Sequence, residues 1–160
     1  MTQELQINYT PHPKQALVHQ DKARFRIVAA GRRFGKTSMA INEIVKIAVS
    51  NPNKRTWYVA PTYRQAEMIA WRDPKVGIFA FLPPELIKHR WNVDLVVELT
   101  NGHIIEFKGA DKEDRLRGVG LVFVVLEEYG YMRGGMWSEV IRPMLADTGG
   151  TALFIGTPAA

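Results

Sequence analysis

The fold is decided by Phe25-Arg26-Ile27-Val28-Ala29-Ala30 and the residues that follow it, Gly31-Arg32-Arg33-Phe34-Gly35-Lys36-Thr37. The first segment is mostly apolar and predicts a buried strand. Residues 36–49 then carry apolar side chains at the three- and four-residue spacing of a helix. A strand that enters a glycine-containing turn and continues into a helix is typical of a phosphate-binding loop. We therefore expect a nucleotide site formed by Ala30, Gly31, Arg32, Arg33, Phe34, Gly35, Lys36, Thr37 and Ser38.

The residue types in this loop fit the chemistry of a triphosphate. Backbone N–H groups and the positive helix N-terminus would surround the β-phosphate. Lys36 would reach the β- and γ-phosphate oxygens, and Thr37 would offer its hydroxyl to Mg²⁺. Ala30 stands where the usual pattern has its first glycine, and we expect Gly31 to supply the sharp turn one residue later. The alternative, a surface turn capped by a threonine, is disfavoured by the flanking strand and helix patterns.

The rest of the chain predicts an α/β fold. Short apolar segments predict further strands at 56–60, 121–126 and 151–155, and helical patterns lie at 15–20, 62–71 and 137–145. Asn101-Gly102 predicts a hairpin between 94–100 and 103–107, with a type I′ turn that needs two positive φ angles. Pro11 and Pro13 predict an extended lead-in, and residues 72–90 show no clear pattern. We expect a mostly parallel sheet with helices on both faces plus the β-hairpin, in a single domain over residues 1–160.

Two acidic residues follow the strand predicted at 121–126. Glu127 would bind Mg²⁺, directly or through water, and Glu128 would polarise the attacking water. The alternative is a pair of solvated acids at a strand end. Because ligands bind beyond the carboxyl ends of parallel strands, we expect the phosphate loop, Glu127-Glu128 and Gly156-Thr157 to meet in one crevice.

Four arginines and one glutamine are further candidates. Arg32 and Arg33 lie inside the loop, where one of them would stabilise the γ-phosphate in cis. Arg115 and Arg117 precede the acidic strand and could act in cis or reach a neighbouring subunit. Any of these arginines could equally be a solvated loop charge. Gln15 could read adenine through its amide, which both donates and accepts, or could lie on a helix surface.

The composition excludes several classes of protein. Cysteine is absent, which excludes disulfides and thiolate metal sites. The longest apolar run, at 121–126, is far too short to span a membrane. The 21 basic and 16 acidic residues give a net charge of +5, a modest excess that suits a nucleotide or another polyanion.

Several motifs in this order resemble the ATPase domain of the large terminase subunit of tailed bacteriophages. They are the phosphate loop, Ala60-Pro61-Thr62-Tyr63 with Gln65-Ala66, Leu116-Arg117-Gly118, Glu127-Glu128-Tyr129 and Gly156-Thr157-Pro158. The resemblance implies a RecA-like P-loop NTPase that hydrolyses ATP with Mg²⁺ to drive double-stranded DNA into the procapsid. It implies catalytic roles for Lys36, Arg32, Arg117 and Glu128 and a coupling motif at Gly156 and Thr157.

The resemblance also implies partners and a location. It implies a ring, usually pentameric, on the phage portal, working with the small terminase subunit in the cytoplasm of the infected host and not in the virion. Glu127 departs from the family's usual aspartate. The chain ends at Ala160, soon after the coupling motif, so we expect an incomplete ATPase domain without the nuclease domain, and no DNA cleavage. The alternatives are a superfamily 2-like helicase fragment and a catalytically silent nucleotide-binding or assembly fragment.

Overall fold

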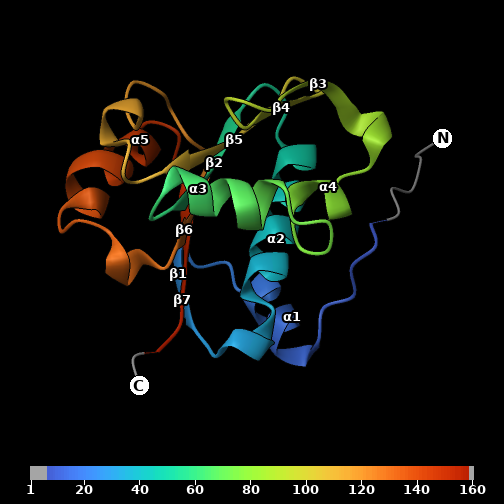
Figure 1. Cartoon of the computed structure of the whole chain (residues 1–160), viewed down its shortest axis with the longest axis horizontal. Helices are drawn as coiled ribbons and strands as arrows, with labels where there is room; N and C mark the ends of the chain where they lie inside the picture. Colours follow the sequence, from blue (N-terminus) through green and yellow to red (C-terminus); the bar gives the residue numbers. More distant parts are fainter. Residues whose placement is uncertain (1–6, 159–160) are drawn as a thin grey trace.

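The computed structural model describes residues 7–158, so the first six and last two residues of the expected domain lie outside the described range. One seven-stranded sheet runs through the molecule in the order β1-β7-β6-β2-β5-β4-β3 (Figure 1). Its strands are β1 (Phe25–Ala29), β2 (Arg55–Ala60), β3 (Ile87–Trp91), β4 (Val96–Leu99), β5 (Ile104–Gly109), β6 (Phe123–Glu127) and β7 (Thr151–Gly156).

The sheet is mostly parallel, as predicted. β1, β7, β6, β2 and β5 all run in one direction, and β4 and β3 are added antiparallel at one edge. β4 and β5 form the predicted hairpin. β1 is the opposite edge, and within residues 7–158 its outer side pairs with no strand. Ile27 in the middle of β1 is 79% exposed.

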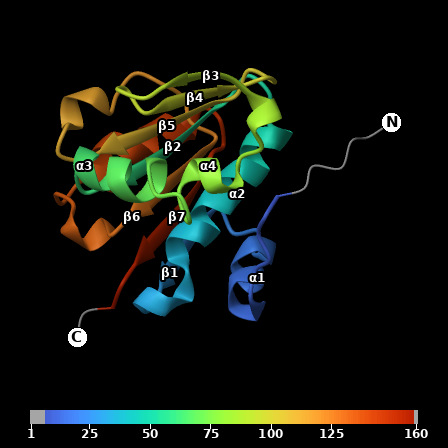
Figure 2. The same cartoon turned by 45° about the vertical axis from the view of Figure 1, so that its right-hand side comes forward.

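Helices cover both faces of the sheet. α2 (Lys36–Ser50), the π-helical segment η2 (Ala66–Trp71) and α4 (Ile78–Phe81) pack on one face. The π-helical segment η6 (Met136–Ile141) and α5 (Arg142–Ala146) pack on the other. Figure 1 shows these layers on either side of the strands, and in Figure 2 α1 (Pro13–Gln20) lies beside α2. The short turns are η1 (Arg32–Phe34), α3 (Tyr63–Gln65), η3 (Pro84–Leu86), η4 (Glu113–Arg115) and η5 (Tyr129–Tyr131).

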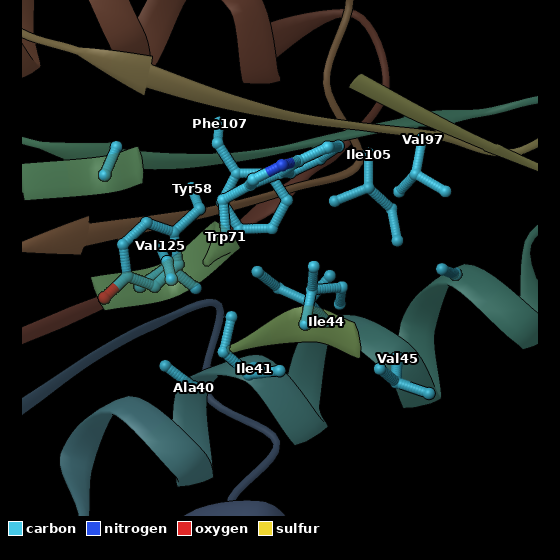
Figure 3. Close-up of a cluster of buried hydrophobic side chains, with 14 of the residues drawn as sticks. Ala40, Ile41, Ile44, Val45, Tyr58, Trp71, Val97, Ile105, Phe107 and Val125 are labelled. Atoms are coloured by element: carbon cyan, nitrogen blue, oxygen red, sulfur yellow. The ribbon is translucent and has the colours of Figure 1, made fainter. Parts of the chain in front are cut away.

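The main core lies between α2 and the sheet. α2 buries an apolar stripe that includes Ile41, Ile44 and Val45, and these side chains face the sheet residues Tyr58 and Phe107 (Figure 3). A second core on the other face is built from the alternate strand residues, among them Trp57, Val59, Val124 and Leu126. Since both faces are covered, the central strands carry near-continuous apolar runs, which is why they were predictable. No helix in the described part of the chain is long and apolar enough to cross a membrane.

Three local predictions need correction. Pro13 does not extend the lead-in but is the first residue of α1, where its missing N–H costs nothing. The turn at Asn101-Gly102 is not type I′, because Gly102 (φ 86°) has a positive φ and Asn101 does not. Instead, Thr100 to Gly102 form a three-residue loop, closed by a bond from Leu99 N–H to the His103 carbonyl at 2.9 Å. β3 was not predicted.

Candidate nucleotide-binding site

The loop between β1 and α2 depends on Gly35. Its backbone is left-handed (φ 78°, ψ 41°), and an added Cβ would lie 2.7 Å from Nε2 of Gln15. Gly31, by contrast, has φ −64° and open space around its Cβ position. The expectation that Gly31 supplies the special turn is therefore wrong. Ala30 is tolerated because it needs no positive φ either, and its N–H bonds to the Gly156 carbonyl at 3.0 Å.

The carboxyl ends of β1, β6 and β7 open into one cleft of about 780 Å³. The loop side contributes Arg32, Gly35, Lys36, Thr37 and Ser38, and the facing side contributes Glu127, Glu128, Gly156 and Thr157. The predicted meeting of these three segments is therefore confirmed. Ala30, Gly31, Arg33 and Phe34 do not line this cleft, so of the two loop arginines it is Arg32 that faces it.

A chain of polar contacts crosses the cleft. The Lys36 ammonium donates to the Ala30 carbonyl and, at 2.9 Å, to Oγ1 of Thr157. The Thr157 hydroxyl in turn donates to Oε1 of Glu128 at 3.0 Å. Thr157 thus links the loop lysine to the second acid. The same ammonium is available to a phosphate oxygen, a stronger partner than a neutral hydroxyl because it is charged.

Glu128 is held in an unusual backbone conformation. Its φ of 47° and ψ of 49° are left-handed, which is uncommon for a residue with a side chain. Its N–H bonds to the Ile155 carbonyl at 2.8 Å, so the β7 strand fixes the turn that directs the carboxylate into the cleft. Backbone strain of this kind concentrates at functional sites.

Glu127, the last residue of β6, is only 7% exposed. Burial raises the pKa of its carboxyl above the usual range, and the Glu128 carboxylate raises it further, while the Tyr58 hydroxyl and Lys36 oppose the shift. The Tyr58 hydroxyl is itself buried beside Glu127 and Thr37, with no clear hydrogen-bond partner among the described residues.

This donor set fits Mg²⁺. Within residues 7–158 no cluster of three or more acidic, histidine or cysteine side chains offers a complete metal site. Mg²⁺ differs from metals that need such a cluster, since it takes one or two carboxylates and completes its shell with water and substrate phosphates. Glu127 and the Thr37 hydroxyl line the same cleft and supply that partial set.

Arg117 lies outside the cleft. It is exposed, and it follows Leu116, which is fully buried in the second core. The preceding turn is fastened by a two-point contact between Glu113 and Arg133, with nitrogen–oxygen distances of 2.6 and 3.0 Å. Arg117 is therefore an exposed residue that follows a fastened turn. Arg115 is exposed as well and lines a separate cavity near β5.

Gln15 does not line the cleft either. Its side chain is 5% exposed and lies under the phosphate loop, where its amide contacts loop carbonyls. Sequence reasoning also missed Val76 and Tyr131, which do line the cleft. Val76 comes from the patternless segment 72–90, and no local signal marks it. Tyr131, 82% exposed, comes three residues after Glu128, and an aromatic residue that close to the acidic pair was the available signal.

The family model for the terminase large subunit, T4likevirus-type, N-terminal, matches residues 27–160. This chain belongs to that family. The terminase large subunits of Thermus virus P23-45 and Thermus phage G20c are each 34% identical to it over 95% of the chain. The alignment covers 34% of each relative, so the chain spans about a third of the length of these terminase subunits.

Solved terminase structures share the fold. The large terminase ATPase domain of Thermus phage P74-26 superposes with a TM-score of 0.84 at 29% identity, over 96% of this chain and 67% of that one. The large terminase of another thermophilic bacteriophage gives a TM-score of 0.73 at 15% identity, over 95% of this chain and 40% of that one. The fold is therefore the α/β fold of terminase ATPase domains, as the resemblance implied.

Proposed function

We propose that this terminase chain binds ATP with Mg²⁺ and hydrolyses it to power DNA packaging. The observation that carries the proposal is the cleft in which Lys36, Thr157 and Glu128 form one connected set. A phosphate-binding lysine and an acid directed at the same space are what hydrolysis of a phosphoanhydride requires. The family match favours this function over a helicase fragment. The more distant of the two solved terminases described above, which shares the fold, has been solved with ADP and with ATP-γ-S.

Each residue has a distinct role in the proposal. Loop N–H groups and Lys36 hold the β- and γ-phosphates, and Thr37 with Glu127 holds Mg²⁺. The metal supplies positive charge to the phosphate oxygens. Glu128 orients a water in line with the γ-phosphate and accepts its proton, so the water oxygen attacks as the bond to the β-phosphate oxygen breaks.

The remaining roles follow from position. Arg32 lines the cleft and would stabilise charge on the departing phosphate in cis, with Arg117 as a second candidate from outside. Gly156 and Thr157 would couple nucleotide occupancy to movement, since Thr157 shares its hydroxyl between Lys36 and Glu128. We place this activity in a ring motor, pentameric on the phage portal, with double-stranded DNA and the small terminase subunit as partners in the host cytoplasm.

Two substitutions test the proposal. Lys36→Ala should weaken ATP binding by about 2 to 3 kcal/mol, because it leaves phosphate charge unpaired. Glu128→Gln should retain binding and lower turnover about a hundredfold or more, the range for loss of a general base. Calorimetry measures the first effect and steady-state phosphate release the second. Lys22→Ala, which removes an exposed lysine away from the cleft, is the matched control and should change neither.

Either result can contradict the proposal. Unchanged ATP affinity in Lys36→Ala would remove the loop from nucleotide binding. If Glu127→Gln abolishes turnover with binding intact while Glu128→Gln remains active, the two acids exchange roles.

A further inference from the structure

We propose that Tyr58 is a positioning residue whose buried hydroxyl holds the two side chains assigned to Mg²⁺, Glu127 and Thr37. Tyr58 lies behind the cleft and does not line it, and its role rests on the nucleotide site proposed above. Three observations carry this role: the place of Tyr58 in the sheet, the direction of its ring and the polar groups beside its hydroxyl.

The sheet places Tyr58 and Glu127 on the same face. Tyr58 in β2 pairs with Val125 in β6, and both side chains belong to the core under α2. Because side chains alternate along a strand, Glu127, two residues after Val125, points to that face as well. α2, which carries Thr37 in its first turn, packs on this face. The three side chains therefore come from three different elements and meet at one place.

Packing holds the Tyr58 ring in one direction. The side chain is fully buried and lies against Phe107, its neighbour in β5, with ring centroids 5.7 Å apart and planes tilted by 31°. In Figure 3 the Tyr58 oxygen points away from Ile44 in α2 and lies on the side of Ala40. The hydroxyl is thus directed toward the start of α2, where Thr37 lies.

The Tyr58 hydroxyl is a buried polar group without a regular partner. It lies beside the carboxyl of Glu127 and the hydroxyl of Thr37, yet no atom of residues 7–158 forms a well-shaped hydrogen bond with it. A buried hydroxyl in this condition costs stability, and folded proteins contain few of them. Since its polar neighbours are the two proposed metal ligands, the hydroxyl can gain partners when these side chains take up their metal-binding arrangement.

A tyrosine hydroxyl has the hydrogen-bonding capacity that the two ligands need. A threonine hydroxyl that gives a lone pair to Mg²⁺ still carries its hydrogen, which requires an acceptor. The Tyr58 oxygen can accept that hydrogen from Thr37 and donate its own to the Glu127 carboxylate. Hydrogen bonds behind the ligands orient them, and their loss commonly weakens metal binding by about ten- to a hundredfold.

A glutamate needs this support more than an aspartate would. Glu127 carries its carboxylate one methylene further from β6 than an aspartate at the same position, and the extra rotatable bond gives it more orientations to lose. The Tyr58 hydroxyl lies on the buried side of this carboxyl, opposite to the cleft. It can therefore select the orientation in which the carboxylate faces the metal.

The test separates metal binding from phosphate binding. ATP-γ-S is titrated into the wild type and into Tyr58→Phe over a range of Mg²⁺ concentrations and, without metal, in EDTA. We expect Tyr58→Phe to need about tenfold more Mg²⁺ for half of the metal-dependent gain in affinity. Its affinity in EDTA should equal that of the wild type, because Lys36 and the loop N–H groups hold the phosphates in both. Tyr63→Phe removes a hydroxyl that donates to the Val93 carbonyl outside the cleft, and this control should bind like the wild type.

Thermal stability provides a second measurement that needs no ligand. Without Mg²⁺ and nucleotide, Tyr58→Phe should melt at the temperature of the wild type or above it. The ring packing is kept, and a buried hydroxyl without a regular partner is removed. A clear drop in melting temperature would show that the hydroxyl stabilises the fold itself and would overturn the proposal.

A double variant tests the contact with Glu127. In a Glu127→Asp background the carboxylate lies one methylene closer to β6, so Tyr58→Phe should raise the Mg²⁺ requirement less than it does in the wild type. An equal rise in both backgrounds would contradict the assigned contact. A Tyr58→Phe variant that matches the wild type at every Mg²⁺ concentration would overturn the role of Tyr58 alone. If the wild type gains no affinity from Mg²⁺, the proposed metal site fails, and the role of Tyr58 fails with it.

Discussion

Glu127 is a buried acid, and its burial disfavours the ionised form of the carboxyl. Its raised pKa means that the folded chain binds this proton more tightly than the unfolded chain. Stability is therefore lost as pH rises from the ordinary value of 4.5 through the raised value, and the loss stays constant above it. A residue that costs stability in this way agrees with a metal ligand that must ionise when the metal binds.

Glu127→Gln should for this reason stabilise the chain at neutral pH in the absence of Mg²⁺ and nucleotide. The gain in melting temperature should be smallest near about pH 4, where the acid is protonated in both states, and should then grow and level off. Thermal denaturation across that range measures it, with exposed Glu85→Gln as the control. A gain that is already full at the acidic end would show that packing and not ionisation causes it.

The two glycines of the phosphate loop, Gly31 and Gly35, should respond differently to replacement by alanine. Gly35→Ala should destabilise the chain by about 1 to 2 kcal/mol, because an alanine pays that much in a left-handed conformation and its Cβ would also press on Gln15. Gly31→Ala should be neutral or slightly stabilising, since its φ suits any residue and its surroundings are open. Denaturant unfolding of the two variants measures the difference. Equal effects would mean that the loop is not shaped as described.

The sequence predicted those helices and strands in which the spacing of apolar residues matches the face that is buried. α2, β2, β6 and β7 were predictable because they are buried and their apolar side chains follow helix or strand spacing. β3 was not, because Lys88, His89 and Arg90 are exposed on an edge and show no alternation. The turn type at Asn101 was missed because its side chain donates to the end of α2, a contact distant in sequence.

The candidate site was predictable to the same extent. The meeting of three motifs in one cleft follows from a general rule about the carboxyl ends of parallel strands. The place of Gln15 beneath the loop, and that of Val76 in the cleft wall, depends on how distant segments pack, which no local pattern encodes. The left-handed turn at Glu128 was equally hidden, because its cause is the bond to β7.

On the scale of the whole molecule, Arg117 is exposed and does not line the cleft of its own chain. In a ring, such a residue could serve the neighbouring subunit. We expect the isolated chain to hydrolyse ATP slowly, with a rate per subunit that rises with concentration, since arginine fingers contribute about 10³ to 10⁵ in rate. Phosphate release measured over a range of protein concentrations tests this.

Mixing inactive variants decides whether Arg117 acts on the site of a neighbouring subunit (in trans) or on the site of its own chain (in cis). Arg117→Ala and Glu128→Gln should recover activity together, because a mixed interface can hold one intact Glu128 and one intact Arg117. Lys36→Ala mixed with Glu128→Gln is the control and should stay inactive, as both residues belong to the cleft of one chain. Concentration-independent turnover that Arg117→Ala abolishes would place the arginine in cis. Full activity of Arg117→Ala alone would leave Arg32, Arg33 or Arg115 as the candidates for stabilising the γ-phosphate.

The position of β7 has a mechanical consequence. β7 lies between the strand that leads into the phosphate loop and the strand that ends in the acidic pair, and it pairs along its length with both. A tension applied to the chain just after Thr157 would act along the strand axis and load both ladders in shear, so their bonds would resist together. The first thing to yield would be the short stretch that carries Thr157, which would move away from Lys36 and Glu128 at once. A pull on the chain at this end of the sheet would therefore break the link that Thr157 makes between the lysine and the carboxylate.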